Sequence, residues 1–232
     1  MYRGIRRLAA VAALGAATVL PLAAQATLID FEDPLLTGLY FSGDTFSQAG
    51  FLMTQEVGDS GIVDRALSLG AAAPTNNLTQ YYANTNDGGL LLTSVSGRPF
   101  SLDGFDAAFV PLIGSHAPPQ TLGIVAVATT ATGASFGTLF GLGNTTSVTQ
   151  GSPFLTFAGA ANFARFSNLI SVDFFTCTIA DSQLCTLLTQ NNGQFALDNI
   201  RVTAPVPEPE TYALMMAGIA ALAAVARRRR RL

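Results

Sequence analysis

Residues 100–109 read Phe-Ser-Leu-Asp-Gly-Phe-Asp-Ala-Ala-Phe, and this stretch shows the pattern that decides the fold class. Phe100 and Leu102 alternate with polar residues, as in a strand that buries one face. The alternation changes phase near Gly104 before it resumes at Phe105, and a β-bulge produces such a shift. The pattern therefore predicts a bulged strand whose phenylalanines lie in a core.

Residues 27–205 continue with short apolar or alternating runs broken by Gly, Asn, Asp, Ser and Thr. Helical periodicity nowhere lasts longer than a turn or two, so we predict an all-β domain, an antiparallel β-sandwich of jelly-roll type. About 180 residues suffice for one such domain with a sizeable core. The predicted strands are Thr27–Phe31, Gly50–Thr54, Ala66–Leu69, Leu90–Ser94, Phe100–Phe109, Leu122–Ala128, Ser135–Leu142, Phe154–Ala158, Ile170–Thr176 and Phe195–Thr203.

Charge is distributed unevenly along the chain. The net charge of the 232 residues is −3, but most of the arginines lie in the two tails and lysine is absent. Between Thr27 and Val206 four arginines accompany thirteen Asp and Glu residues, a net charge of −9. Nucleic acid is therefore not an expected partner, because its phosphates need basic residues. The balance is compatible with divalent cations or neutral sugars.

The N-terminus has the three parts of a signal peptide. Met1–Arg7 is basic, Leu8–Leu22 is apolar, and the small residues Ala24 and Ala26 stand at the −3 and −1 positions of a cleavage site. The apolar run is short for a retained membrane anchor. We expect residues 1–26 to be removed on export.

The C-terminal segment, residues 206–232, also has three parts. They are the motif Val206-Pro207-Glu208-Pro209 within residues 206–211, an apolar helix over 212–226 and a basic tail over 227–232. Such a helix rises about 22 Å. This is short of the ~30 Å hydrocarbon core, and flanking arginines can extend the span into the headgroups. We expect a transmembrane helix with a cytoplasmic C-terminus.

This arrangement resembles the PEP-CTERM sorting signal. The resemblance implies recognition by an exosortase, a membrane-embedded cysteine protease, after transient anchoring in the inner membrane. The expected location is the cell surface or the exterior of a Gram-negative cell, often one that makes exopolysaccharide. An ordinary single-pass anchor behind a proline-rich hinge is the alternative. Gln194-Phe195-x-x-Asp198 also resembles a subgroup of PEP-CTERM proteins marked by Q-F-x-x-D.

Acidic residues at both ends of the domain suggest a cation site. Asp30, Glu32 and Asp33 lie near its start and Asp198 near its end, and the first and last strands of jelly rolls are often neighbours. Carboxylates that converge there would suit calcium. The Leu-Asp-Asn segment resembles the last strand of calcium-stapled carbohydrate-binding modules. In the other interpretation Asp198-Asn199 turns the strand and the N-terminal acids are solvated. No further cofactor is expected.

Cys177 and Cys185 are the two cysteines of the chain. They are close in sequence, and an exported protein meets an oxidising compartment. We expect a structural disulfide between them.

Two further motifs resemble functional sites but also have simple structural interpretations. Gly58-Asp59-Ser60-Gly61 resembles the nucleophile segment of trypsin-like proteases, but the sole histidine, His116, follows the serine instead of preceding it, so we interpret the motif as a turn. Tyr81-Tyr82 lies among asparagines and is either an exposed ligand contact or a plain loop.

These observations favour an exported, non-catalytic surface or extracellular-matrix protein that associates with exopolysaccharide. An adhesion or self-assembling structural protein is the alternative, because strands with few charges suit contacts through sheet edges. A glycan hydrolase with a carboxylate pair is a third possibility. The expected partners are the exosortase, exopolysaccharide and, before processing, the membrane.

Overall fold

The computed structural model describes residues 24–64, 73–111, 121–144, 151–179, 185–187, 194–205 and 218–219. Contacts divide the chain into two compact units, Ala26–Ala204 and a unit made of Met1–Gln25 with Pro205–Leu232. The predicted strand Ala66–Leu69, the basic and apolar parts of the signal peptide and almost all of the C-terminal segment lie outside the described residues. Within the described part, no helix is long and apolar enough to cross a membrane.

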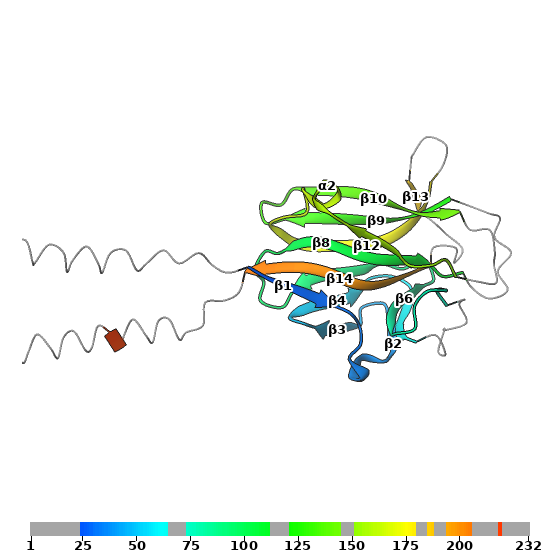
Figure 1. Ribbon diagram of the computed structural model, residues 1–232, viewed down its shortest axis with the longest axis horizontal. Helices are drawn as coiled ribbons and strands as arrows, with labels where there is room; N and C mark the ends of the chain where they lie inside the picture. Colours follow the sequence, from blue (N-terminus) through cyan, green and yellow to red (C-terminus); the bar gives the residue numbers. More distant parts are fainter. Residues whose placement is uncertain are drawn as a thin grey trace, which may run out of the picture. The chain divides into compact units, whose positions relative to one another are not determined.

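The described residues of the domain form two seven-stranded sheets (Figure 1). Sheet A has the order β11 (Leu155–Ala158), β8 (Ser101–Phe109), β14 (Phe195–Pro205), β6 (Tyr81–Thr85), β5 (Asp59–Val63), β2 (Gly38–Phe41), with β1 (Ala24–Ile29) beside β14. Sheet B has the order β10 (Ser135–Asn144), β9 (Thr121–Thr130), β12 (Leu169–Ile179), β7 (Leu90–Ser94), β4 (Phe51–Gln55), β3 (Thr45–Gln48), with β13 (Cys185–Leu187) beside β12. The predicted antiparallel β-sandwich is confirmed.

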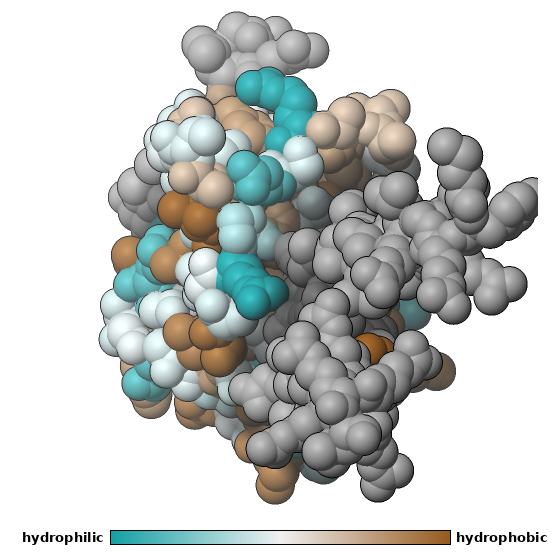
Figure 2. Space-filling model, turned by 90° about the vertical axis from the view of Figure 1, so that its left-hand side faces the viewer, coloured by the Kyte–Doolittle hydropathy of each residue, from teal (hydrophilic) through white to brown (hydrophobic). Residues whose placement is uncertain are grey.

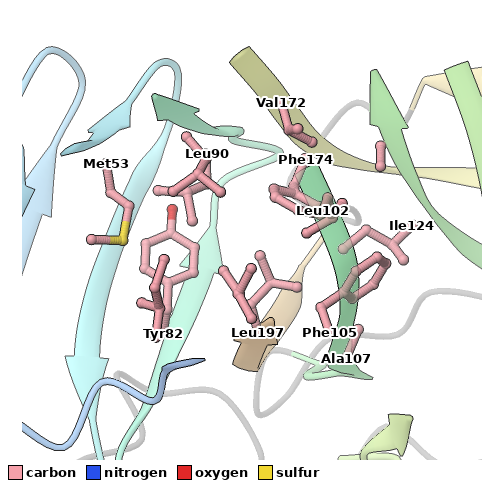
Figure 3. Close-up of a cluster of buried hydrophobic side chains, with 14 of the residues drawn as sticks. Met53, Tyr82, Leu90, Leu102, Phe105, Ala107, Ile124, Val172, Phe174 and Leu197 are labelled. Carbon is pink, nitrogen blue, oxygen red and sulfur yellow. The ribbon is translucent and has the colours of Figure 1, made fainter. Parts of the chain in front are cut away.

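The core lies between the two sheets because each strand sends alternate side chains inward. In Figure 3, Tyr82 and Leu197 of sheet A lie with Met53, Leu90 and Phe174 of sheet B in one cluster. The residues that alternate with these along each strand, such as Leu52 in β4 and Asp173 in β12, lie on the outer faces of the sheets and are only partly buried. Alternation along the sequence thus becomes the division between core and surface.

Phe105 of β8 is the centre of a group of aromatic rings. Its ring centroid lies 5.0 Å from Phe140, 5.4 Å from Phe157, 5.9 Å from Phe163 and 5.2 Å from Phe174. Phe163 belongs to the short helix α2 (Ala160–Phe163), which lies close to β10 in Figure 1. The helix therefore fills the side of the sandwich between β10 and β11.

The bulge predicted near Gly104 is present where β8 pairs with β14. Asp106 is opposite Asp198 and Gly104 is opposite Arg201, so β14 carries an extra residue between these pairs. The next pair is Leu102 with Val202, so β8 carries an extra residue beside Gly104, as predicted. Asn199 lies in the β14 bulge with a φ of 48°, a left-handed conformation that asparagine tolerates.

The interpretations of two motifs were wrong. Asp59 and Ser60 begin β5 instead of forming a turn, although Gly58 turns the chain with a φ of 76°. Tyr81 and Tyr82 are neither a loop nor exposed: they belong to β6 and are 2% and 0% exposed. The polar side chains of this strand are tolerated inside the domain because they form hydrogen bonds there.

A buried polar network joins the two sheets near Tyr82. The Tyr82 hydroxyl donates a hydrogen bond to Gln55 Oε1 and accepts one from Asn84 Nδ2 at 3.0 Å. Gln55 Nε2 donates to the carbonyl of Val57 at 2.6 Å. Burial raises the pKa of the Tyr82 hydroxyl well above its usual value. The network therefore stays neutral at physiological pH and holds β4 against β6.

Candidate functional site

The outer face of sheet B, which we call the open face, presents partly exposed side chains across six strands. The centre of the outer face of sheet A differs, since Tyr81, Ala83, Ala108 and Ala196 are buried there. A ligand that lies across a sheet would therefore meet side chains on sheet B.

One row of the open face consists almost entirely of hydroxyl side chains. Strand register places residues from β10, β9, β12, β7, β4 and β3 side by side in the order Ser135, Thr129, Ser171, Thr93, Leu52, Ser47. Five of these six residues are serine or threonine, and each hydroxyl both donates and accepts hydrogen bonds. With neighbouring strands about 4.8 Å apart, the row is about 24 Å long.

The next row has Asp173 at its centre, between Val127 of β9 and Leu91 of β7. Asp173 Oδ1 is buried and has no hydrogen-bond partner. Gly89 makes room for it, since a Cβ there would lie 3.3 Å from Asp173 Oδ1. Burial, and secondarily the neighbouring Glu56, raises the pKa of Asp173 to about 7. A carboxyl group of this kind can accept or donate hydrogen bonds near neutral pH.

A third row is apolar. Phe175 of β12, half-buried, lies beside Val125 of β9, which pairs with Leu139 of β10. Two residues after Phe175, Cys177 forms the expected disulfide with Cys185, with a Cα–Cα distance of 5.4 Å. The open face thus carries hydroxyls, a carboxyl group and an aromatic ring within three neighbouring rows.

The raised pKa of Asp173 makes stability depend on pH. Between about pH 4 and pH 7 the folded domain holds a proton on Asp173 that the unfolded chain releases, so this group's contribution to stability is fully present below about pH 4 and is lost as pH rises through 7. We expect the melting temperature to be lower at about pH 8 than at about pH 5. Asp173→Asn should raise the melting temperature at the higher pH and reduce the difference.

The matched variant is Glu56→Gln, which removes the charge next to Asp173 and should move the fall in stability to lower pH. Scanning calorimetry of the three proteins across this pH range measures both effects. An unchanged pH profile for Asp173→Asn would contradict the assignment.

The predicted acidic cluster is assembled only in part. β1 pairs with β14, so the ends of the domain meet as expected. Glu32 lies near enough to Asp198 that its charge contributes to the raised pKa of Asp198. Asp30 Oδ1 instead accepts a hydrogen bond from Gln48 Nε2 at 2.8 Å, and Asp33 Oδ1 accepts one from the amide of Leu35 at 2.9 Å.

The hydrogen-bond partners of Asp198 are residues outside the predicted acidic cluster. Asn77 Nδ2 donates to Asp198 Oδ2 at 2.9 Å, and the amide of Asn199 donates to Oδ1 at 2.7 Å. Asp106, which pairs with Asp198 between β8 and β14, accepts hydrogen bonds from Asn199 Nδ2 at 2.9 Å and from Arg201 Nη2 at 3.2 Å. Asp198 is 4% exposed, and burial raises its pKa to about 7.

These contacts make the Asp198 region a buried link between β14 and its neighbours. Among the residues that the structure describes, no three Asp, Glu, His or Cys side chains are grouped in a way that would hold a metal. Calcium at Asp30, Glu32 and Asp198 stays a prediction. Asn77 and Asp106 were not predicted as partners of Asp198, because strand register brings Asp106 to it and Asn77 reaches it from the loop before β6.

Exposed apolar residues outside the open face are scattered. Leu39 and Phe41 of the edge strand β2 are 58% and 56% exposed, and Val57 and Val95 lie in turns. On the coloured part of the side drawn in Figure 2, hydrophobic and hydrophilic residues are interspersed. Single exposed apolar residues of this kind are normal on protein surfaces.

Residues 205–231 match the family model of the PEP-CTERM protein-sorting motif. The chain carries a PEP-CTERM sorting motif. The match includes Val206–Pro209 and confirms the resemblance seen in the sequence. The PEP-CTERM motif implies export, exosortase processing and sorting to the cell surface. Cleavage after Ala26 and assignment to the Q-F-x-x-D subgroup stay predictions.

A search of curated proteins found no match. Among solved structures, the CBM22-2 xylan-binding domain of Paenibacillus barcinonensis Xyn10C is 13% identical with a TM-score of 0.36, and the match covers 77% of this chain and 98% of that one. A family 29 carbohydrate-binding module is 11% identical, with a TM-score of 0.30 and coverage of 82% and 97%.

The family 11 carbohydrate-binding module from Clostridium thermocellum, in complex with a β-1,3-1,4-mixed-linked tetrasaccharide, is 11% identical to this PEP-CTERM chain. Its TM-score is 0.31, and the match covers 78% of this chain and 96% of that one. Likeness at this level does not say what the present chain binds.

Proposed function

We propose that this exported, PEP-CTERM-sorted protein is a non-catalytic surface or matrix protein that binds neutral exopolysaccharide along the open face of sheet B. The observation that carries the proposal is the set of three rows on that face. Sugars present hydroxyl groups at their edges and C–H groups on their faces, and the rows offer partners for both.

The hydroxyl row and Asp173 supply the polar part of the interaction. Ser171, Thr93 and Thr129 are partly buried and adjacent, so their hydroxyls are held by the sheet and lose little freedom when a ligand binds. Phe175 supplies an apolar surface for the C–H groups of a sugar ring. The ligand would lie across the strands, parallel to the rows.

Charge favours an uncharged glycan. None of the strands of sheet B contains an arginine among the described residues: Arg201 lies in β14 and pairs with Asp106, Arg165 lies over the ring of Phe136, and Arg98 lies in the loop after β7. The charged groups at the face are the carboxyl groups of Asp173 and Glu56. Uronic acids or sulfated sugars would meet repulsion and no cation there.

Glycan hydrolysis is the second candidate, and one observation favours it. Asp173 has a pKa of about 7 beside Glu56, and a raised carboxyl pKa is a property of general acids. The two functions differ in a simple measurement, because only hydrolysis releases reducing ends.

The test is a pull-down of the Ala26–Ala204 unit, which contains the described core, on exopolysaccharide of the producing cell. We expect saturable binding and no release of reducing ends. Phe175→Ala should weaken binding by about tenfold, the effect of losing ~1.4 kcal/mol. The matched control is Phe41→Ala, which removes an exposed phenylalanine from the other sheet and should leave binding unchanged.

Each alternative gives a different result. Binding that EDTA removes would support the predicted calcium. Turnover that Asp173→Asn abolishes would establish a hydrolase, and absence of binding to any fraction of the polysaccharide would overturn the proposal.

A further inference from the structure

We propose that two copies of this chain associate through β10, the edge strand of sheet B, in an antiparallel β10–β10 pair. The edge strands and the charge distribution of the domain support this pairing, which does not depend on glycan binding.

β10 lacks the charges, prolines and short length that normally protect an edge strand. The short helix α2 packs against its inward-facing ring Phe140, with Phe163 at 5.4 Å. β10 spans ten residues, Ser135–Asn144, with neither a charged residue nor a proline among them. Edge strands are usually short, charged or interrupted by proline, because their free N–H and C=O groups can pair with another chain. In the described part of the chain, β9 is the single strand paired with β10.

The opposite edge of the sandwich is protected. β2 and β3 have four residues each. Asp44 stands in the turn between them, and Asp59 pairs with Phe41 of β2. Short strands flanked by carboxylates are poor templates for a second strand.

Acidic residues are likewise absent from β10 and from the segments around it in the sequence. The sequence has no Asp or Glu between Asp106 and Asp173, so β9, β10, β11 and α2 contain no carboxylate. The rest of a domain with a net charge of −9 carries all thirteen. Two copies that approach each other meet the least repulsion on the β10 side, and a partner with the same charge pattern fits there best.

The backbone of β10 is open to close approach. Gly137 is exposed, and a Cβ added to Gly141 would meet nothing within 4 Å. A bulge lies between Gly141 and Gly143, so the regular part of the strand runs from Ser135 to Gly141. Antiparallel pairing of this segment with itself is centred on Thr138 and places Gly137 opposite Leu139 of the second copy.

Such a pair has a consequence for the open face. A two-fold axis perpendicular to the sheet keeps both outer faces on one side, so the two open faces form one wider surface. In this register Ser135 lies opposite Gly141 of the second copy, so the two hydroxyl rows run in opposite directions and are offset by about 20 Å along the strand. If the proposed glycan binding is correct, a polymer that spans both copies gains affinity through avidity. The association itself does not depend on a ligand.

The test is sedimentation velocity on the full-length protein, expressed in an exosortase-containing host and purified in its processed form. We expect a monomer–dimer equilibrium. Gly137→Glu places like charges near the two-fold axis and should raise the dissociation constant at least about tenfold. The space around Gly137 permits the change, because a Cβ there has its nearest neighbour, Val127 Cγ2, at 3.6 Å.

Two control variants accompany it: Gly137→Ser, which adds a Cβ without charge, and Ser47→Glu, which adds the same charge to β3 at the other edge of the sheet. Both should associate like the unmodified protein, and circular dichroism should show all variants folded. A protein that is monomeric at all concentrations overturns the proposal. So does association that Gly137→Glu leaves intact, or that Ser47→Glu removes.

Discussion

Phe105→Ala should lower the free energy of unfolding by about 3–5 kcal/mol, the loss usual for a buried phenylalanine. The ring is fully buried and lies against four other aromatic rings, including Phe140 at 5.0 Å and Phe174 at 5.2 Å. These rings come from both sheets and cannot all move to fill the cavity. Since single domains are stable by roughly 5–15 kcal/mol, the variant would be close to unfolding. Urea denaturation measures the change.

Phe41→Ala is the control for this prediction, because Phe41 is 56% exposed on an edge strand. It should change stability by no more than about 0.5 kcal/mol. A Phe105→Ala variant as stable as Phe41→Ala would show that the sheets do not pack around Phe105 as described.

Alanine at Pro207, Glu208 and Pro209 should leave nearly all of the protein unprocessed at its C-terminus. Proline disfavours helix at its own position and at the residue before it, so we expect the motif to offer the extended backbone that a protease needs. We expect the variant to stay in the membrane fraction with its tail attached, as immunoblots of cell fractions and intact-mass measurement would show.

Pro153→Ala is the control for sorting, since Pro153 is an exposed proline within the domain. Processing should be normal in that variant. Processing of the triple variant at the normal rate would contradict the assigned role of the motif.

Local sequence pattern was sufficient where a strand alternates. Leu90–Ser94 was predicted with the bounds that β7 has, and the phase shift near Gly104 revealed the bulge with β14. Cys177 and Cys185 pair as their spacing and export suggested. In each case the signal lies within a few neighbouring residues.

The pattern failed where long-range contacts decide burial. The sequence around Tyr82 and Asn84 resembles a polar loop. In the core, Asn84 donates a hydrogen bond to the Tyr82 hydroxyl, which in turn donates one to Gln55 of the other sheet. The hydroxyl row combines six strands, and the register that aligns Ser171 with Thr93 is not visible in either strand alone. Asp173 did give a local signal: it is the one carboxylate in the apolar strand β12.

The central claim is that a neutral glycan binds along the open face of sheet B. The most direct measurement is the change in backbone amide chemical shifts of the isotope-labelled Ala26–Ala204 unit when oligosaccharides from the producing cell's exopolysaccharide are added. We expect the largest changes at Thr93, Ser171, Asp173 and Phe175, with little change on β2. Changes confined to sheet A, or none at saturating oligosaccharide, would contradict it.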